Sequence, residues 1–295
     1  SLYDDFDFVT RVGVYQVNDP TIDVSLMCDR ALLALRSVKN NYLARVAFYD
    51  DSMRASLLEE QEILQEMERA LAQGQFVVYL QPQYDYAAGT VDGAEALVRW
   101  QHPKKGLISP GKFIPVFERN GFISNVDEYV WEQVCRMLRG WLDDGKPIVP
   151  ISVNISRRDI YRSHLCGLLQ NLVKKYRLAP ELLRLEITES AYMDNPDQLI
   201  EIVNELLAAG FTVEMDDFGS GYSSLNTLKD VPVQTLKLYI KFLEKSMNDT
   251  RGGNILTSVI RMAHWLKLPV IAEGVETKAQ ADYLKSIGCT HMQGY

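Results

Sequence analysis

The stretch VEMDDFGSGYSSL (213–225) ends an apolar run on two consecutive aspartates, and five other stretches repeat this pattern. Each is a short, strand-like apolar run that reaches a carboxylate, amide or ammonium group. They are GAEALVRW (93–100), ISVNIS (151–156), LRLEITES (183–190), QTLKL (234–238) and VIAEGVE (270–276). In a barrel of parallel strands, all these ends would meet on one rim. The pattern therefore predicts one site that is built from several strand ends.

The polar side chains at these ends predict a site for hard cations. The expected members are Glu95, Asn154, Glu186, Asp216, Asp217, Lys237 and Glu273. Carboxylates that converge without histidine or cysteine favour Mg²⁺ or Mn²⁺. Two such ions about 3.5–4 Å apart can activate water and stabilise both oxygens of a displacement at phosphorus. Any one of these carboxylates could instead serve an ordinary salt bridge, but few cations lie near the strand ends.

Individual residue types suit individual tasks in such a site. Asp216 is our candidate for a carboxylate that bridges two ions, and the amide oxygen of Asn154 could bind an ion without adding charge. Lys237 is suited to hold an attacking water or a developing negative charge as a point cation. Arg99 carries the planar donor fork that fits a pair of phosphate oxygens.

The composition limits the class of protein. The chain has 295 residues, 47 % of them hydrophobic, which is enough for one large domain with a real core. Its net charge of −8 argues against a broad electrostatic grip on duplex nucleic acid, although a small anionic ligand stays compatible. The four cysteines are scattered and form no CxxC pair, which is typical of reduced cysteines in a cytosolic protein. With no membrane-spanning apolar run, we expect a cytoplasmic protein, or the cytoplasmic part of a membrane-anchored one.

Three segments follow one another along the chain. Residues 1–50 predict a strand, a helix and a strand, too little for a stable domain alone. Residues 51–74 predict an amphipathic linker helix, with Ser52 as its N-cap and Gly74 as its stop. From residue 75 to residue 295, strands and helices alternate.

This alternation predicts an α/β fold, a (β/α)₈ TIM-like barrel. The eight expected strands are QFVVYLQP, GAEALVRW, PISVNIS, LRLEITE, TVEMDD, QTLKL, PVIAEG and THMQGY. Helical patterns separate most of them, at 126–142, 156–177, 197–210 and 253–268. Only residues 84–92 join the first two strands, and that connection is too short for a helical crossover. The first strand is therefore expected to be antiparallel to the second.

The motifs also occur in a family order. EALVRW, VNIS, LEITES, DDFGSGYSSL, the lysine of LKL, IAEGVET and QGY stand in the order seen in EAL-domain phosphodiesterases, and residues 75–295 resemble that family throughout. The resemblance implies a barrel with an antiparallel first strand and hydrolysis of cyclic di-GMP to linear pGpG with two Mg²⁺ or Mn²⁺ ions. Residues 1–50 are similar to the C-terminal end of a GGDEF domain, without its catalytic motif. A homodimer and sensory domains in a longer parent chain are also implied.

The resemblance assigns roles residue by residue. The implied metal ligands are Glu95, Asn154, Glu186 and Asp216, with Asp217 and Glu273 on the side of the second ion. The implied catalytic residues are Lys237, which orients the water, and Glu273, which has also been cast as the general base. The implied substrate or water contacts are Gln81, Arg99 and Gln293. The implied anchors of the mobile loop after the paired aspartates are Glu189 and Glu276.

The sequence departs from the family pattern at three positions. Tyr239 stands where active relatives usually carry an aspartate two residues after the lysine, and a neutral phenol cannot replace that charge. Glu214 stands where a small or apolar residue is common; it either enters the site with Asp216 or is turned outward by a bulge. Ser220 replaces a frequent threonine. Tyr239 and Glu214 favour an alternative, a catalytically silent cyclic di-GMP receptor, whereas the change at Ser220 is mild. An unrelated metal-dependent barrel enzyme acting on a sugar phosphate has little weight.

Overall fold

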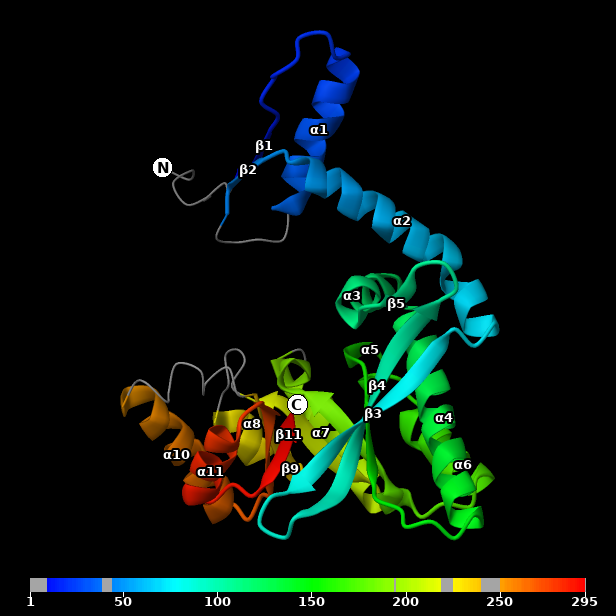
Figure 1. Cartoon of the computed structure of the whole chain (residues 1–295), viewed down its shortest axis with the longest axis vertical. Coiled ribbons are helices and arrows are strands. Elements are labelled where there is room, and N and C mark those ends of the chain that lie inside the picture. The colour runs from blue at the N-terminus through cyan, green and yellow to red at the C-terminus, as the bar shows by residue number, and fades with distance from the viewer. Residues whose placement is uncertain (1–9, 39–43, 194, 219–224, 240–249, 295) are drawn as a thin grey trace, which may run out of the picture. The chain divides into compact units, whose positions relative to one another are not determined.

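The computed structural model describes residues 10–38, 44–193, 195–218, 225–239 and 250–294 (Figure 1). The chain separates into two compact units, Ser1–Arg69 and Ala70–Tyr295. Within the described part of the chain, no helix combines the length and apolar character that crossing a membrane requires.

The first unit holds one strand–helix–strand motif. Strand β1 (Val12–Val14) pairs in parallel with β2 (Val46–Phe48), and helix α1 (Val24–Ser37) connects them. The helix lies close against β1 at Gly13, where a Cβ atom would stand 2.1 Å from the carbonyl oxygen of Ala31. Only glycine permits this approach of backbone to backbone.

Helix α2 (Asp51–Ala72) begins at Asp51, so Ser52 lies inside its first turn. The prediction that Ser52 is its N-cap is wrong, because the carboxylate of Asp50 accepts the N–H of Ser52 at 2.7 Å. Aspartate readily binds a backbone N–H two residues further on, and this bond satisfies one of the unpaired N–H groups of the first turn. At the other end, Gly74 follows the helix with a φ of 66°, a conformation that favours glycine.

The second unit contains a closed barrel of eight strands. They are β3 (Phe76–Asp85), β4 (Thr90–His102), β6 (Ile151–Asn154), β7 (Leu183–Thr188), β8 (Thr212–Phe218), β9 (Thr235–Tyr239), β10 (Val270–Val275) and β11 (His291–Gly294). The order around the barrel is β3, β11, β10, β9, β8, β7, β6, β4, and β4 pairs with β3 to close it. Strand β3 is antiparallel to both neighbours, and the other junctions are parallel. A short strand, β5 (Gly106–Ile108), extends the end of β4.

Helices cover the outside of the barrel (Figure 1). They are α3 (Pro110–Asn120), α4 (Ile123–Asp143), α5 (Arg157–Ile160), α6 (Leu165–Lys175), α7 (Pro196–Ala208), α8 (Leu225–Asp230), α10 (Thr250–Trp265) and α11 (Lys278–Ser286), with short 3₁₀ turns η1 (Pro180–Leu182) and η2 (Glu189–Met193). The prediction of one helix over 156–177 is wrong. The chain turns between α5 and α6, where Arg162 binds Asp159 through both its backbone N–H and its guanidinium.

The alternation of residues along the strands separates the core from the site. On β7, Leu183, Leu185 and Ile187 are almost fully buried. Arg184 and Glu186 alternate with them; Arg184 forms an ion pair with Glu214 of the neighbouring strand β8, and Glu186 with Lys237 of β9. Successive side chains of a strand point to opposite faces, so the apolar set faces the helices and the polar set faces the barrel interior.

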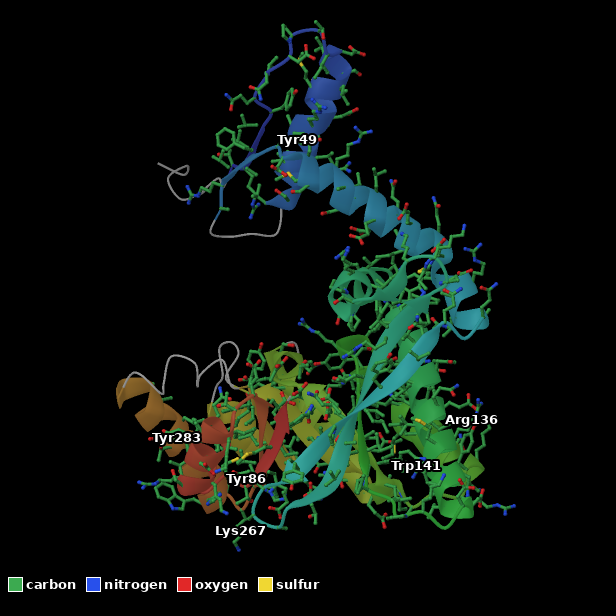
Figure 2. The ribbon with its side chains drawn as sticks, in the orientation of Figure 1. Tyr49, Tyr86, Arg136, Trp141, Lys267 and Tyr283 are labelled. Carbon is green, nitrogen blue, oxygen red and sulfur yellow. The ribbon has the colours of Figure 1, made fainter. Side chains whose placement is uncertain are left out.

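The connection between β3 and β4 is fixed from outside the barrel. The hydroxyl of Tyr86 donates a hydrogen bond of 2.7 Å to Asp282 on α11, and the ammonium of Lys285 lies 5.6 Å from the centroid of the Tyr86 ring (Figure 2). Gly89, with a φ of 74°, completes the turn. These contacts tie the hairpin that closes the barrel to the last helix.

An aromatic cluster occupies the other end of this hairpin. Phe76, Trp100, Phe113 and Phe117 are essentially buried, and their ring centroids lie 5.2–6.1 Å apart. Rings at such distances stabilise one another beyond their buried area. The cluster therefore packs α3 onto the first residue of β3 and the end of β4.

Candidate active site

One network of contacts links eight of the expected side chains inside the barrel. Each comes from a different strand: Gln81, Glu95, Asn154, Glu186, Asp216, Lys237, Glu273 and Gln293. Direct hydrogen bonds and ion pairs join them. The strand-end pattern predicts this convergence for six of them, because the carboxyl ends of parallel strands meet at one rim, whereas Gln81 and Gln293 were implied by the family resemblance alone.

Lys237 occupies the centre of this network. Its Nζ lies 2.7 Å from Glu186 Oε1, 2.8 Å from Glu273 Oε1 and 2.9 Å from Glu95 Oε2. Asp216 Oδ1 is further away, at 3.7 Å. The lysine side chain is fully buried, so its charge is balanced by these carboxylates rather than by water.

Burial alone would lower the pKa of Lys237, but the carboxylates around it, Glu186 first, raise that pKa well above its ordinary value. The lysine therefore stays charged at any physiological pH. Burial also raises the pKa of Glu186 well above normal, and Lys237 offsets only part of this effect. A single ammonium group does not neutralise all the surrounding carboxylates.

The other carboxyl groups respond differently to the same surroundings. Burial raises the pKa of Asp216 to about 6 and that of Glu273 to about 7, against the opposing charge of the lysine. Burial opposes ionisation of Glu95 too, but there the lysine and a hydrogen bond from Gln293 outweigh it and lower the pKa. The site therefore combines one carboxylate whose pKa is lowered, Glu95, with three carboxyl groups whose pKa values are raised, Glu186, Asp216 and Glu273.

A bulge in β8 brings two neighbouring aspartates to one place. The register of β8 against β9 shifts between Met215 and Phe218, and Asp217 has a φ of 55°. Its backbone N–H donates to the carboxylate of Asp216 at 2.8 Å. In a regular strand these two side chains would point to opposite faces. The bulge instead allows Asp216, Asp217 and Glu273 to place carboxylate oxygens within 4.8 Å of one another.

Amide side chains line the site on the side of β3 and β11. Gln293 Nε2 donates to Glu95 Oε2 at 2.5 Å and to Gln81 Oε1 at 3.1 Å. Gln83 follows Gln81 by two residues on β3, so its side chain also points into the barrel. Its amide donates to Gln293 Oε1 at 3.2 Å. Gln83 was not expected from the sequence. The signal that could have found it is its position two residues after Gln81, because the alternation of a strand places both side chains on the same face.

Glu214 lies inside the barrel, so the expectation that a bulge turns it outward is wrong. Its side chain is fully buried, Ser152 Oγ donates to it at 2.7 Å, and Arg184 Nη1 lies 3.5 Å away. The β8 bulge comes after this residue, so Glu214 keeps the inward direction that alternation gives it. Glu214 stands two residues before Asp216, but its carboxylate pairs with Ser152 and Arg184 rather than with Lys237.

A cavity of about 820 Å³ opens beside this network. Glu95 and Asn154 contribute to one part of its wall, and Arg99, Arg157 and Arg158 to another. This volume is in the range of ligand pockets. Its wall combines carboxylates with guanidinium groups, and the latter suit an anionic ligand. Arg99, expected to contact substrate, does line the cavity.

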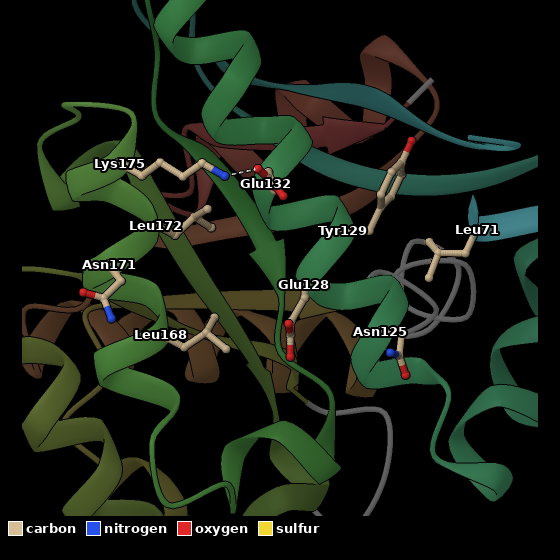
Figure 3. A pocket seen from close by; sticks show the side chains of 9 residues that line it. All are labelled: Leu71, Asn125, Glu128, Tyr129, Glu132, Leu168, Asn171, Leu172 and Lys175. Atoms are coloured by element: carbon tan, nitrogen blue, oxygen red, sulfur yellow. Dashed lines mark hydrogen bonds and ion pairs between the residues drawn. The ribbon is translucent and has the colours of Figure 1, made fainter. Parts of the chain in front are cut away.

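A second cavity, of about 440 Å³, lies on the outside of the barrel between α4 and α6 (Figure 3). Its wall consists of Leu71, Asn125, Glu128, Tyr129, Glu132, Leu168, Asn171, Leu172 and Lys175. Glu132 accepts hydrogen bonds from Lys175 at 2.6 Å and from Tyr176 at 2.8 Å. Its charged groups are thus engaged with one another, and the first cavity is the better candidate for a site.

The remaining expected residues lie around the site. Tyr239 is half-buried and stands opposite Glu273 in the pairing of β9 with β10. Glu189 is buried in η2, whereas Glu276 is exposed and its backbone N–H binds Gln280. Ser220 and the loop around it lie outside the described residues.

The donor set fits divalent cations. Glu186 Oε2 is buried and has no hydrogen-bond partner among the described residues. The oxygens of Asp216, Asp217 and Glu273 converge beside it in the same network. Carboxylate and amide oxygens without sulfur or imidazole are the ligands that Mg²⁺ and Mn²⁺ prefer.

A closed (β/α)₈-type barrel with an acidic site at the carboxyl ends of its strands defines the class of protein. The EAL domain family matches residues 64–295, and the chain belongs to that family.

Named relatives share this region. The chain is 37 % identical over 248 residues to the bifunctional diguanylate cyclase/cyclic di-GMP phosphodiesterase MucR of Pseudomonas aeruginosa, which covers 84 % of the chain and 36 % of MucR. It is 35 % identical over 263 residues to the cyclic di-GMP phosphodiesterase NbdA of the same organism, covering 89 % of the chain and 34 % of NbdA. The chain therefore spans about a third of the length of these relatives.

Solved structures agree with the fold. A complex of the MucR phosphodiesterase with c-di-GMP superposes with a TM-score of 0.75 at 37 % identity, covering 79 % of this chain and 94 % of that one. The EAL enzyme Bd1971 in its cAMP- and cyclic-di-GMP-bound form gives a TM-score of 0.76 at 28 % identity, covering 93 % and 73 %.

Proposed function

We propose that this chain hydrolyses cyclic di-GMP to linear pGpG with the help of two divalent cations, Mg²⁺ or Mn²⁺. The observation that carries the proposal is the gathering of carboxylates around Lys237 beside a cavity of about 820 Å³. Relatives named as cyclic di-GMP phosphodiesterases, at 35–37 % identity, support the choice of substrate.

The residues that would hold the ions are Glu95, Asn154, Glu186, Asp216, Asp217 and Glu273. Once bound, two such ions lower the pKa of a bound water and stabilise charge on the phosphate oxygens. The amide of Asn154 now donates to Glu95 Oε1 at 3.2 Å, so its oxygen is the atom available for an ion.

The chain's own side chains would then position the water and move its proton. The ammonium of Lys237 donates only and stays charged, so it would orient a water through an oxygen lone pair. A carboxylate oxygen of Glu273 would accept the proton of that water, which is the role of general base that the family resemblance implies for this residue. Arg99 would bind a phosphate through its planar donors. Gln81 and Gln293 would contact the substrate or its water.

Further parts of the proposal rest on the family resemblance. Glu189 and Glu276 would anchor the loop that follows the paired aspartates. Residues 1–50 would be the C-terminal part of a GGDEF-like domain, and residues 51–74 the helix that links it to the barrel domain over 75–295. The parallel β1–α1–β2 motif is compatible with this assignment. A homodimer and sensory domains in a longer parent chain would supply regulation.

A second candidate function is a receptor that binds cyclic di-GMP without hydrolysing it. Tyr239 favours it, because a neutral phenol stands opposite Glu273 where a further carboxylate would be expected. If the missing charge limits turnover, Tyr239→Asp should raise the rate of hydrolysis. An unchanged rate in that variant would remove this argument for the receptor.

The test is turnover of cyclic di-GMP by the purified chain with Mg²⁺, with Mn²⁺ and with EDTA. Metal-dependent production of pGpG is expected, and Glu95→Gln should abolish it because that carboxylate is both a ligand and a partner of Lys237. The matched control is Glu201→Gln, which changes an exposed carboxylate of α7 that belongs neither to the network nor to the cavity wall. Binding of cyclic di-GMP without any pGpG would select the receptor. Full turnover by Glu95→Gln would contradict the metal site.

A further inference from the structure

Gln83 lies in the interior of the barrel, beside the network around Lys237. Its side chain is 1 % exposed, and among the described residues it does not belong to the wall of the large cavity. In the strand pairing it stands between Gln293 of β11 on one side and Gly93 of β4 on the other. Any effect of Gln83 on a ligand in the cavity must therefore pass through its neighbours.

Hydrogen bonds join Gln83 to the site in one direction. Gln83 Nε2 donates to Gln293 Oε1 at 3.2 Å, and Gln293 Nε2 donates to Glu95 Oε2 at 2.5 Å. The same nitrogen of Gln293 also donates to Gln81 Oε1 at 3.1 Å. Gln293 thus turns its oxygen toward Gln83 and its nitrogen toward Glu95.

The direction of these bonds matters because an amide group has nearly the same shape in two orientations. Turning the amide of Gln293 by 180° would exchange its oxygen and its nitrogen. The oxygen would then face Glu95 Oε2, and two acceptors cannot form a hydrogen bond. On the other side, the nitrogen would face the amide nitrogen of Gln83, which is also a donor. Gln83 therefore selects the orientation in which Gln293 donates to Glu95.

The surroundings of Gln83 oppose a joint turn of both amides. A Cβ atom on Gly93 would stand 2.4 Å from Gln83 Oε1 and 3.3 Å from Arg184 Nη1, so these two atoms approach the same point. Gln83 Oε1 has no hydrogen-bond partner among the described residues. A guanidinium group carries donors only, so Arg184 favours the oxygen rather than the nitrogen of Gln83 on this side. The missing side chain of Gly93 leaves the room that this arrangement needs.

The bond from Gln293 helps to hold the carboxylate of Glu95. Lys237 Nζ and Gln293 Nε2 both bind its Oε2. Its Oε1 lies beside Asn154, whose Nδ2 is 3.2 Å away, and Glu95 and Asn154 both line the cavity. Two donors on Oε2 thus keep one expected metal ligand next to another.

We propose that Gln83 is a positioning residue of the site, which sets the orientation of the Gln293 amide and, through it, the carboxylate of Glu95. Its effect on a bound cation rests on the proposed function, whereas the orientation of the amide does not. Residues that orient a metal ligand from behind typically change metal affinity by about 10–100-fold when they are removed. Because Gln83 acts through one intermediate residue, the lower end of this range is expected.

The experiment is a double-mutant cycle measured by isothermal titration with Mn²⁺. Gln83→Met removes the donor and keeps an unbranched side chain of the same length, and it should weaken binding by about tenfold. Gln293→Met should weaken binding at least as much. In the Gln293→Met background, Gln83→Met should add less than about twofold, because the residue through which it acts is already absent.

Two further variants test the geometry. Gly93→Ala changes no polar group, but its Cβ would displace the amide of Gln83, so it should weaken Mn²⁺ binding in the same direction as Gln83→Met. Gln101→Met is the matched control, because Gln101 is an exposed glutamine of β4. Its replacement should leave the affinity within about twofold of the parent.

NMR spectroscopy in EDTA tests the orientation of the amide without any metal. The side-chain nitrogen of Gln293 donates two hydrogen bonds, so its NH₂ signal should be protected from exchange with solvent in the parent. The signal is identified by its loss in Gln293→Met. In Gln83→Met the oxygen of this amide loses its donor, and the protection should fall. A role of Gln83 in packing alone would leave the signal unchanged.

Three results would overturn the proposal. The first is a Gln83→Met protein that binds Mn²⁺ as tightly as the parent. The second is a double variant in which the two substitutions weaken binding independently, so that their factors multiply. The third is an unchanged NH₂ signal of Gln293 in Gln83→Met. If the parent itself binds no Mn²⁺, the proposed cofactor is refuted, and the NMR comparison still decides on the role of Gln83.

Discussion

Replacing Lys237 by methionine removes the only cation within 4 Å of the site carboxylates among the described residues. The side chain stays unbranched and becomes one heavy atom shorter, and three contacts of 2.7–2.9 Å lose their positive partner. Removing one member of a buried ion pair typically costs about 3–5 kcal/mol, because the remaining charge stays buried. Several ion-pair partners are lost, but carboxylates that are left without a cation can take up protons, and this keeps the loss of stability within that range.

The assay is thermal unfolding of Lys237→Met at pH 7.5 in EDTA and then in Mg²⁺. For a unit of this size, about 3–5 kcal/mol corresponds to a fall in melting temperature of roughly 6–20 °C. Mg²⁺ should recover part of the fall, since a cation that binds only the folded state stabilises it. At pH 5 the fall should be smaller, because more of the carboxylates are then protonated.

Lys229→Met is the matched control. Its side chain is 79 % exposed and lies 3.8 Å from Asp230, so it should change stability by less than about 0.5 kcal/mol. If Lys237→Met and the parent have the same melting temperature in EDTA at pH 7.5, Lys237 does not stabilise the fold by balancing the charge of the carboxylates. The electrostatic account of the site would then be wrong.

Three further outcomes are expected. Arg184→Leu should lower the free energy of unfolding in urea by about 3 kcal/mol, because Glu214 then stays buried without its cation. Adding Glu214→Ala should recover most of that loss. Equal stability of the single and double variants would contradict the pairing. The affinity for Mn²⁺ should rise by about tenfold or more from pH 5.5 to pH 8, because the ion must displace protons from Glu273 and Asp216, whose pKa values are about 7 and 6. An affinity that does not change with pH in titration calorimetry would argue against these ligands. Phe113→Ala should cost about 3–5 kcal/mol by opening a cavity in the aromatic cluster, and a loss below about 1 kcal/mol would show that the cluster does not secure α3.

The barrel could be read from the sequence because strands have a period of two. LRLEIT alternates leucine or isoleucine with polar residues, which predicts one face toward helices and one toward the interior. The convergence of Glu95, Glu186 and Lys237 then follows from the fold class, since parallel strands end at one rim.

Features that depend on local backbone geometry could not be predicted. Nothing in the letters DD indicates that a bulge places Asp216 and Asp217 on the same side, or that Asp217 takes a φ of 55°. The break between α5 and α6 depends on Arg162 binding Asp159, a contact that periodicity does not contain.

The buried carboxyl group of Asp127, which accepts the backbone N–H of Ser156, was missed for another reason. Asp127 stands among Val126, Val130 and Trp131 on the buried face of α4, so a carboxylate at an apolar helical position was visible in the sequence. That signal reports an unusual buried charge, but not its partner. Only the packing of α4 against the end of β6 supplies it.

The reversed direction of β3 has a mechanical consequence for the whole chain. In a barrel whose strands are all parallel, the chain would begin its first strand at the face opposite the reaction. Here Phe76 starts β3 opposite Trp100, near the end of β4 that leads away from Glu95, so the chain joins the barrel from the reactive side. Gln81 lies only five residues further along the same strand and contacts Gln293. The backbone before residue 76 is therefore connected to the side chains of the Lys237 network through a few residues of one strand, without crossing the barrel.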